Sequence, residues 1–118
     1  MRDHERVRRS GAGLRVTVLV GEWDRFGRRP LHRALLERAR DEGVGCAFVL
    51  HGIEGFGRSG RIHTARLLDL AEDLPIAVVL VDTEARIRSL LPRLAPLLAG
   101  RLATVERVEL PPRTPRTP

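Results

Sequence analysis

The chain has 118 residues, of which 42% are apolar and 31% charged, as is typical of one globular domain rather than a disordered segment. No apolar run approaches the roughly 20 residues of a membrane-spanning helix, and residues 1–13 lack the apolar core of a signal peptide. The single cysteine, Cys46, excludes a disulfide within the chain, and we expect its thiol to be buried and inert. These features predict a cytoplasmic protein.

The net charge of +6 is concentrated at the two ends of the chain. Residues 1–12 carry +2, residues 111–118 carry +2, and the long body between them carries only +2. A body this balanced, with one tryptophan, three phenylalanines and no tyrosine, is a poor candidate for a nucleic-acid groove. We expect a flexible basic arm at 1–12, a folded domain at 13–110 and a disordered proline-rich tail at 111–118.

The first half of the domain predicts a strand and a helix. "LRVTVLVG", from Leu14 to Gly21, is a short β-branched run that is typical of a strand buried on both faces. Pro30 then opens a helix whose apolar positions repeat at helical spacing. Arg38 and Glu42 lie four residues apart on its outer side, which favours an ion pair, and Gly43 is predicted to end the helix.

The second half predicts three strands and a helix. The strands are "GCAFVLHGI" (45–53), "LPIAVVLVD" (74–82) and "RLATVERVEL" (101–110), and the imperfect alternation of the last favours an edge position or a bulge. Residues 66–73 fit either a helical turn or a backward extension of the third strand. Asp82 or Thr83 is expected to cap the second helix. Pro92 and Pro96 predict a kink or a restart within that helix.

The element order is therefore β-α-β-β-α-β. Right-handed crossovers place both helices on one face of a four-stranded antiparallel sheet. The predicted fold class is α+β, with a ferredoxin-like sandwich.

Four stretches of the chain resemble a known family. The motifs "VGEWDRFGRRPLHRALLERAR", "HGIEGFG", "RIHTARLLDLAEDLPIAVVLVD" and "IRSLLPRL" are similar to those of the family called domain of unknown function 190, which is related to the PII signalling proteins. The resemblance covers about residues 14–110. His32 and His51 stand where the family usually has an aromatic residue and an arginine.

This resemblance implies a PII-like ferredoxin fold and a homotrimer. It also implies that the loop between the second and third strands is the counterpart of the PII T-loop, with nucleotides or other small effectors bound near its base between subunits. Some family members occur beside, or fused to, membrane fluoride channels, which implies a different role as an accessory subunit of a channel or transporter.

The residues themselves mark "GFGRSGRIHT", between Gly55 and Thr64, as the best candidate site. Its glycines permit positive φ and a close approach of backbone N–H groups to an anion, and its arginines are fork-like donors that suit phosphate. A solvated surface loop remains the alternative. The candidate ligand-binding residues are Gly55, Gly57, Arg58, Gly60, Arg61, His63 and Thr64.

A second stretch, "GEWDRFG" (21–27), follows the first strand. Glu22 and Asp24 are candidates to orient an arginine of the glycine-rich loop or to accept a hydrogen bond from a ligand hydroxyl. The alternative, weighed at least equally, is that Asp24 caps a turn and Trp23 packs at a subunit interface.

Catalysis and metal binding are not predicted. No zinc-ligand spacing is present among the histidines and acids, and no serine, threonine or cysteine has the setting of a nucleophile. We expect a regulatory module, not an enzyme, that binds a small anionic effector such as a nucleotide and docks on a partner protein. The open alternatives are a channel or transporter accessory subunit without a small ligand, and a structural or metal-tolerance oligomer.

Overall fold

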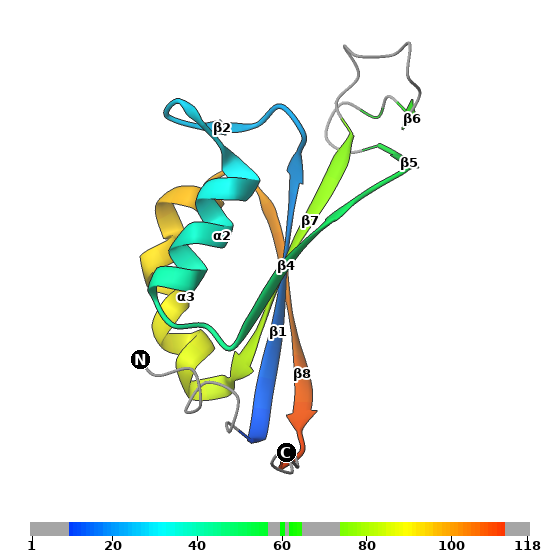
Figure 1. The fold of residues 1–118 in the computed structure, drawn as a ribbon. Coiled ribbons are helices and arrows are strands. Elements are labelled where there is room, and N and C mark those ends of the chain that lie inside the picture. Colours follow the sequence, from blue (N-terminus) through cyan, green and yellow to red (C-terminus); the bar gives the residue numbers. More distant parts are fainter. Residues whose placement is uncertain (1–9, 57–59, 61, 65–73, 113–118) are drawn as a thin grey trace, which may run out of the picture.

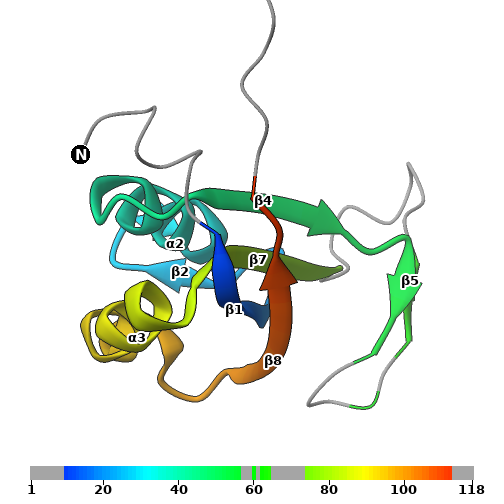
Figure 2. The ribbon, with the colours of Figure 1, turned by 90° about the horizontal axis from the view of Figure 1, so that it is seen from below.

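The main sheet has four antiparallel strands in the order β4-β7-β1-β8. The computed structural model describes residues 10–56, 60, 62–64 and 74–112. The strands of this sheet are β1 (Gly11–Gly21), β4 (Cys46–His51), β7 (Pro75–Thr83) and β8 (Leu102–Leu110). The helices α2 (Leu31–Asp41) and α3 (Glu84–Leu98) cover one face of the sheet (Figures 1 and 2). The predicted ferredoxin-like arrangement is confirmed.

Two short hairpins extend from one end of the sheet. The first pairs β2 (Arg25–Phe26) with β3 (Arg29–Pro30) and leads into α2. The second pairs β5 (Glu54–Gly55) with β6 (His63–Thr64) and projects away from the sheet (Figure 1).

The strand register brings these connections to a common edge. β1 ends at Gly21 opposite Pro75, the first residue of β7, while Leu19 lies opposite Leu102, the first residue of β8. β4 ends at His51, opposite the second residue of β7. We call this end of the sheet, with the connections that leave it, the loop edge. The β1 start and the β8 end lie at the opposite end (Figure 1).

The hydrophobic core lies between the sheet and the two helices. Alternate side chains of β1 and β7 point into it, and every second residue of β1 from Leu14 to Val20 is at most 5% exposed. α2 and α3 contribute apolar residues at helical spacing. The helical core residues are Leu31, Ala34, Leu35, Ala39, Ile87, Leu90, Leu94 and Leu97.

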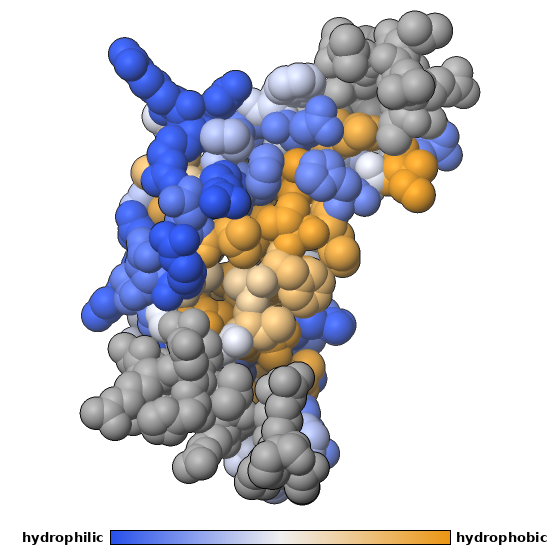
Figure 3. Space-filling view, viewed as in Figure 1, coloured by the Kyte–Doolittle hydropathy of each residue, from blue (hydrophilic) through white to orange (hydrophobic). Residues whose placement is uncertain are grey.

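The other face of the sheet is uncovered in the single chain, so the prediction that the first strand is buried on both faces is wrong. Leu19 is 41% exposed, and it lies in one cross-strand row with Leu50, at 54%, and Leu102, at 63%. Phe48, at 41%, adds to the same surface. We call this surface the open face. Figure 3 shows apolar side chains gathered over the sheet, beside a charged helix layer.

The cysteine prediction is also wrong, because Cys46 is exposed. Cys46 lies opposite Val81, which lies opposite Arg15 on the open face. An apolar run in an edge strand still alternates its side chains between two faces, and only one face of β4 is covered by helices.

The residues predicted to start and end the helices occupy those positions, whereas the interior of α3 differs in part from the prediction. Pro30 occupies the N-cap of α2, and Gly43, with φ of +81°, follows its C-cap. The Thr83 hydroxyl accepts a hydrogen bond from the Arg86 N–H at the start of α3. α3 runs without a break through Pro92 and Pro96, so of the two predicted alternatives the restart is wrong and the kink stays a prediction. Both prolines are on the solvent side, where water can satisfy the carbonyl groups that lose a donor.

Asp82 anchors the end of the sheet opposite the loop edge. It is 3% exposed, and its carboxylate accepts hydrogen bonds from the Gly45 N–H at 2.9 Å and the Thr83 N–H at 2.7 Å. Arg86 Nε lies 4.0 Å away. One buried side chain therefore ties β7 to the start of β4 and to the first turn of α3.

We expect Asp82→Ala to lower the free energy of unfolding by about 2 kcal/mol, since it leaves buried N–H donors without an acceptor. Chemical denaturation at fixed protein concentration measures this loss. Asp41→Ala removes an exposed aspartate and should change stability by less than about 0.5 kcal/mol. Equal stability of the two variants would contradict the anchoring role of Asp82.

Candidate functional site

Polar side chains from four separate segments of the chain lie at the loop edge. Glu22 and Asp24 follow β1, His32 lies in the first turn of α2, His51 ends β4, and Arg101 precedes β8. Their positions follow from the antiparallel register, which brings the β1 and β4 ends to the starts of β7 and β8. The site is therefore built from parts of the chain that are far apart in sequence.

Asp24 organises the connection between β1 and α2. Its carboxylate accepts a hydrogen bond from the Gly21 N–H at 2.8 Å, and its own N–H donates to the Gly21 carbonyl at 3.2 Å. Its carbonyl accepts from the Leu31 N–H at 2.8 Å, which secures the start of α2. The alternative interpretation of Asp24 as a turn cap is confirmed. Trp23, within that turn, is 51% exposed.

Arg101 is the cation that lies beside Asp24. Its Nε is 3.1 Å from Asp24 Oδ2, close enough for an ion pair. The Nε–H is nonetheless not directed at that oxygen, so this buried nitrogen has no hydrogen-bond partner among the described residues. A buried donor that is left unsatisfied carries a desolvation cost. Arg101 can therefore gain from an additional acceptor.

His32 and His51 form an edge-to-face pair with ring centroids 6.1 Å apart. His32 Nδ1 is buried and lacks a hydrogen-bond partner within the described part of the chain. Burial lowers the pKa of His32 below its ordinary value of 6.5, and the nearby charges of His51 and Arg33 lower it further, while Glu22 acts in the opposite direction. The neutral form of His32 is thus favoured, and the ring can donate one hydrogen bond and accept another.

The hairpin after β4 is held to the sheet by a close backbone contact. The Gly52 N–H donates to the Pro75 carbonyl at 2.7 Å, and a Cβ at Gly52 would lie 2.6 Å from the Pro75 ring. Only glycine fits this approach without a shift of the proline. The contact between Gly52 and Pro75 therefore fixes the base of the hairpin beside His51 and the start of β7.

The structure brings only some of the predicted site residues together. Glu22 and Asp24 lie at the loop edge, and the Glu22 N–H donates to the Leu74 carbonyl at 2.9 Å. Gly55 lies in β5, and Gly60 has the predicted positive φ, of +73°. The remaining predictions are distributed as follows: His63 and Thr64 form β6, while Gly57, Arg58 and Arg61 lie outside the described residues.

Arg101 and His32 are functional candidates that the sequence prediction did not include. The signal for Arg101 was its place just after the helix-ending Gly100 and before a strand, which also fits an ordinary connection. The signal for His32 was its replacement of a usual aromatic residue. Neither signal points to a ligand until the fold places Arg101 beside Asp24 and His32 beside His51 at the loop edge.

Chemically, the loop edge offers hydrogen-bond donors and the two carboxylates of Glu22 and Asp24 rather than a reaction centre. Among the described residues, no three His, Cys, Asp or Glu side chains gather as metal ligands. The helices of the described part are too short or too polar to cross a membrane. The arrangement suits a ligand that presents anionic or hydrogen-bond-accepting groups to Arg101 and a hydroxyl to Asp24.

Comparison with solved structures places the chain in the PII-like fold class. A structure of CPII from Thiomonas intermedia K12, a nitrogen regulatory PII-like protein bound to ADP, AMP and bicarbonate, matches with a TM-score of 0.60 at 13% identity, covering 87% of this chain and 92% of that one. A structure of CPII bound to ADP and bicarbonate matches with a TM-score of 0.55 at 15% identity, with the same coverage. Identities this low show the fold alone.

Sequence comparison gives the family. Residues 13–110 match the model of the DUF190 family, described as uncharacterized ACR, COG1993. A UPF0166 protein of Aquifex aeolicus (strain VF5) is 32% identical over 95 residues, covering 80% of this chain and 90% of that protein. The chain belongs to the DUF190 family, and the resemblance drawn from its motifs is confirmed.

The depressed pKa of His32 predicts that stability falls in acid. The unfolded chain takes up a proton on His32 near pH 6.5, whereas the folded chain resists protonation. The contribution of His32 is therefore complete above pH 6.5 and is lost as the pH falls toward the native pKa. We expect His32→Gln to flatten the dependence of the unfolding free energy on pH in this window.

NMR titration of the imidazole protons checks the cause of the shift. His51→Gln should raise the pKa of His32 by removing a nearby positive charge, but burial should still hold it below 6.5. An unchanged pKa of His32 in His51→Gln would show that the two rings do not interact electrostatically.

Proposed function

We propose that this protein is a PII-like regulatory module that binds a small anionic effector, a nucleotide such as ADP or AMP, at the loop edge. The observation that carries the proposal is the pair of buried nitrogens, Arg101 Nε and His32 Nδ1, that lack hydrogen-bond partners among the described residues and lie at the same edge. Ligand acceptors would satisfy such groups once the side chains that cover them move aside. The nucleotides bound by the PII-like CPII structures support this ligand class.

In this proposal, Arg101 and Asp24 recognise different parts of the nucleotide, one by charge and the other by hydrogen bonding. Arg101 supplies a guanidinium for a phosphate group, and Asp24 can accept from a ribose hydroxyl once its contact with Arg101 loosens. The glycine- and arginine-containing loop between β5 and β6 begins at this edge and supplies further cationic residues from its sequence. Binding of an anion there would favour one conformation of the hairpin over others, and so shift its population.

The β5–β6 hairpin is proposed to dock on a partner protein. The β5–β6 hairpin and its flanks expose Ile53 at 76%, Phe56 at 67% and Ile62 at 61%. Large apolar side chains this exposed suit contact with another protein surface. In this proposal the protein acts in the cytoplasm, catalyses no reaction, and signals effector level through the conformation of its hairpin.

A homotrimer built through the open face is part of the same proposal. The row of Leu50, Ala77, Leu19 and Leu102 runs across all four strands, and burial of such a surface is favourable by about 25 cal/mol per Å². Association of three sheets would cover the open face and bring the loop edges of neighbouring subunits together, as the resemblance to PII proteins implies.

We expect calorimetry to detect binding of ADP or AMP to the full chain, and Arg101→Ala to weaken it about 10- to 100-fold, because a charge-assisted hydrogen bond contributes about 1.5–3 kcal/mol. Arg88→Ala, which removes an exposed arginine of α3 that pairs with Glu84, is the matched control and should bind like the parent. Bicarbonate is tested alone and with each nucleotide.

Failure of every nucleotide to bind, or equal affinity of Arg101→Ala and the parent, would overturn the effector proposal. Co-purification with a membrane channel or transporter, unaffected by nucleotide, would instead favour the accessory-subunit alternative.

We expect the parent chain to sediment as three chains of 13.2 kDa each. Leu19→Glu should reduce the mass to that of one chain, because it would bury an unpaired carboxylate in the interface. Ala95→Glu places the same charge on an exposed position of α3 and should leave the mass unchanged. Analytical ultracentrifugation measures both, and an unaltered trimer in Leu19→Glu would exclude the open face as the interface.

A further inference from the structure

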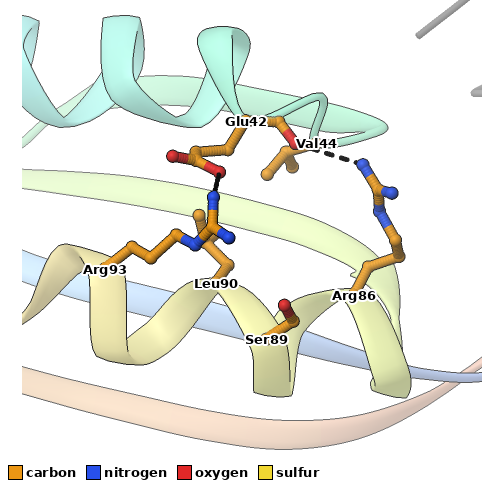
Figure 4. Close-up of a pocket in the computed structure, with 6 residues that line it drawn as sticks. All are labelled: Glu42, Val44, Arg86, Ser89, Leu90 and Arg93. Carbon is orange, nitrogen blue, oxygen red and sulfur yellow. Dashed lines mark hydrogen bonds and ion pairs between the residues drawn. The ribbon is translucent and has the colours of Figure 1, made fainter.

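A hollow lies at the other end of the molecule, between α3 and the turn that joins α2 to β4 (Figure 4). It has a volume of about 230 Å³. Its apolar floor comes from Val44 and Leu90, which are 7% and 4% exposed. Its polar lining consists of Glu42, Arg86, Ser89 and Arg93.

The spacing on α3 explains why these polar groups converge. Arg86, Ser89 and Arg93 are separated by three and four residues, so they lie on one face of the helix. Figure 4 shows both arginine side chains reaching toward the α2–β4 turn, with Ser89 between them along the helix. A hydroxyl flanked by two guanidinium groups is a donor set that suits a tetrahedral oxyanion.

Existing contacts hold the two guanidinium groups in place. Arg86 Nη2 donates to the carbonyls of Glu42 at 3.1 Å and Gly43 at 3.3 Å, which directly follow the last residue of α2. Arg93 Nη1 donates to Glu42 Oε2 at 2.8 Å. Arg86 Nε also lies 4.0 Å from the buried Asp82 carboxylate, so the carbonyl contacts orient a cation whose charge is balanced in part from behind the hollow.

Among the described residues that line the hollow, Glu42 is the one acidic side chain, and it acts as an internal counter-ion of Arg93. The sequence favoured a pair with Arg38 on the same helix, but Glu42 reaches across to α3, and Arg38 Nη1 donates instead to the Arg93 carbonyl at 3.1 Å. The Arg93 side chain is 62% exposed. An external anion can therefore approach Arg93 from solvent and compete with the Glu42 carboxylate.

We propose that this hollow is a second anion site, which binds a phosphate group between Arg93 and Ser89 and excludes it while Glu42 occupies Arg93. The Arg86 guanidinium adds positive potential, and the apolar floor excludes water from one side of the ligand. The site is independent of the loop edge, since the two lie at opposite ends of the sheet. Displacement of Glu42 would release a contact that joins α2 to α3.

Titration with inorganic phosphate, followed by two-dimensional NMR at low ionic strength, tests this proposal. We expect weak binding to the parent chain and about tenfold or tighter binding to Glu42→Gln, which removes the competing charge but keeps the shape. In the Glu42→Gln background, Arg93→Gln should abolish the gain, and the milder Ser89→Ala should reduce it severalfold.

A control variant tests whether phosphate binding is specific to the hollow. Arg88→Gln, on the same helix but outside the hollow, should bind phosphate like its parent. Thermal melting confirms that each variant is folded. If Glu42→Gln binds phosphate no more tightly than the parent, or if Arg93→Gln keeps the gain, the Arg93–Glu42 pair is a structural contact only and the proposal is wrong.

Discussion

The pairing of β1 with both β7 and β8 determines most of what this protein can do. β1 lies in the middle of the sheet and pairs with residues 75–83 on one side and 102–110 on the other. This register fixes which connections share an edge, so that turns separated by dozens of residues become neighbours. It also divides each strand into a helix-covered face and an open face, which sets the hydrophobic core and the proposed oligomer surface.

The two ends of the sheet repeat one electrostatic arrangement. At the loop edge Arg101 lies beside Asp24, and at the opposite end Arg93 contacts Glu42. In each case an internal carboxylate partly satisfies an arginine that has donors to spare for an external anion. Partly exposed ion pairs of this kind contribute little to stability, so exchange of the internal carboxylate for a ligand requires only a modest binding free energy.

The sequence was sufficient for the fold because its local signals agree with one another. Apolar runs, Pro30 before α2 and Gly43 after it predicted the order of the elements. The sequence was insufficient where a property depends on how the helices and strands pack against one another. The burial of Cys46 depends on which face the helices cover, and the importance of Arg101 depends on its meeting Asp24. The arginines of the glycine-rich loop, Arg58 and Arg61, lie outside the described residues and stay predictions.

The contact between β1 and β8 has a consequence for the biogenesis of the protein. The first strand of the domain takes its neighbour on one side from the last, with Gly11 aligned to Leu110. During synthesis, β1 therefore keeps a row of unpaired amide and carbonyl groups until translation has delivered β8 beyond the ribosome exit. Such long-range closure slows folding relative to helical proteins of equal size, and a strand edge that is unpaired in the interval is a template for pairing with another chain.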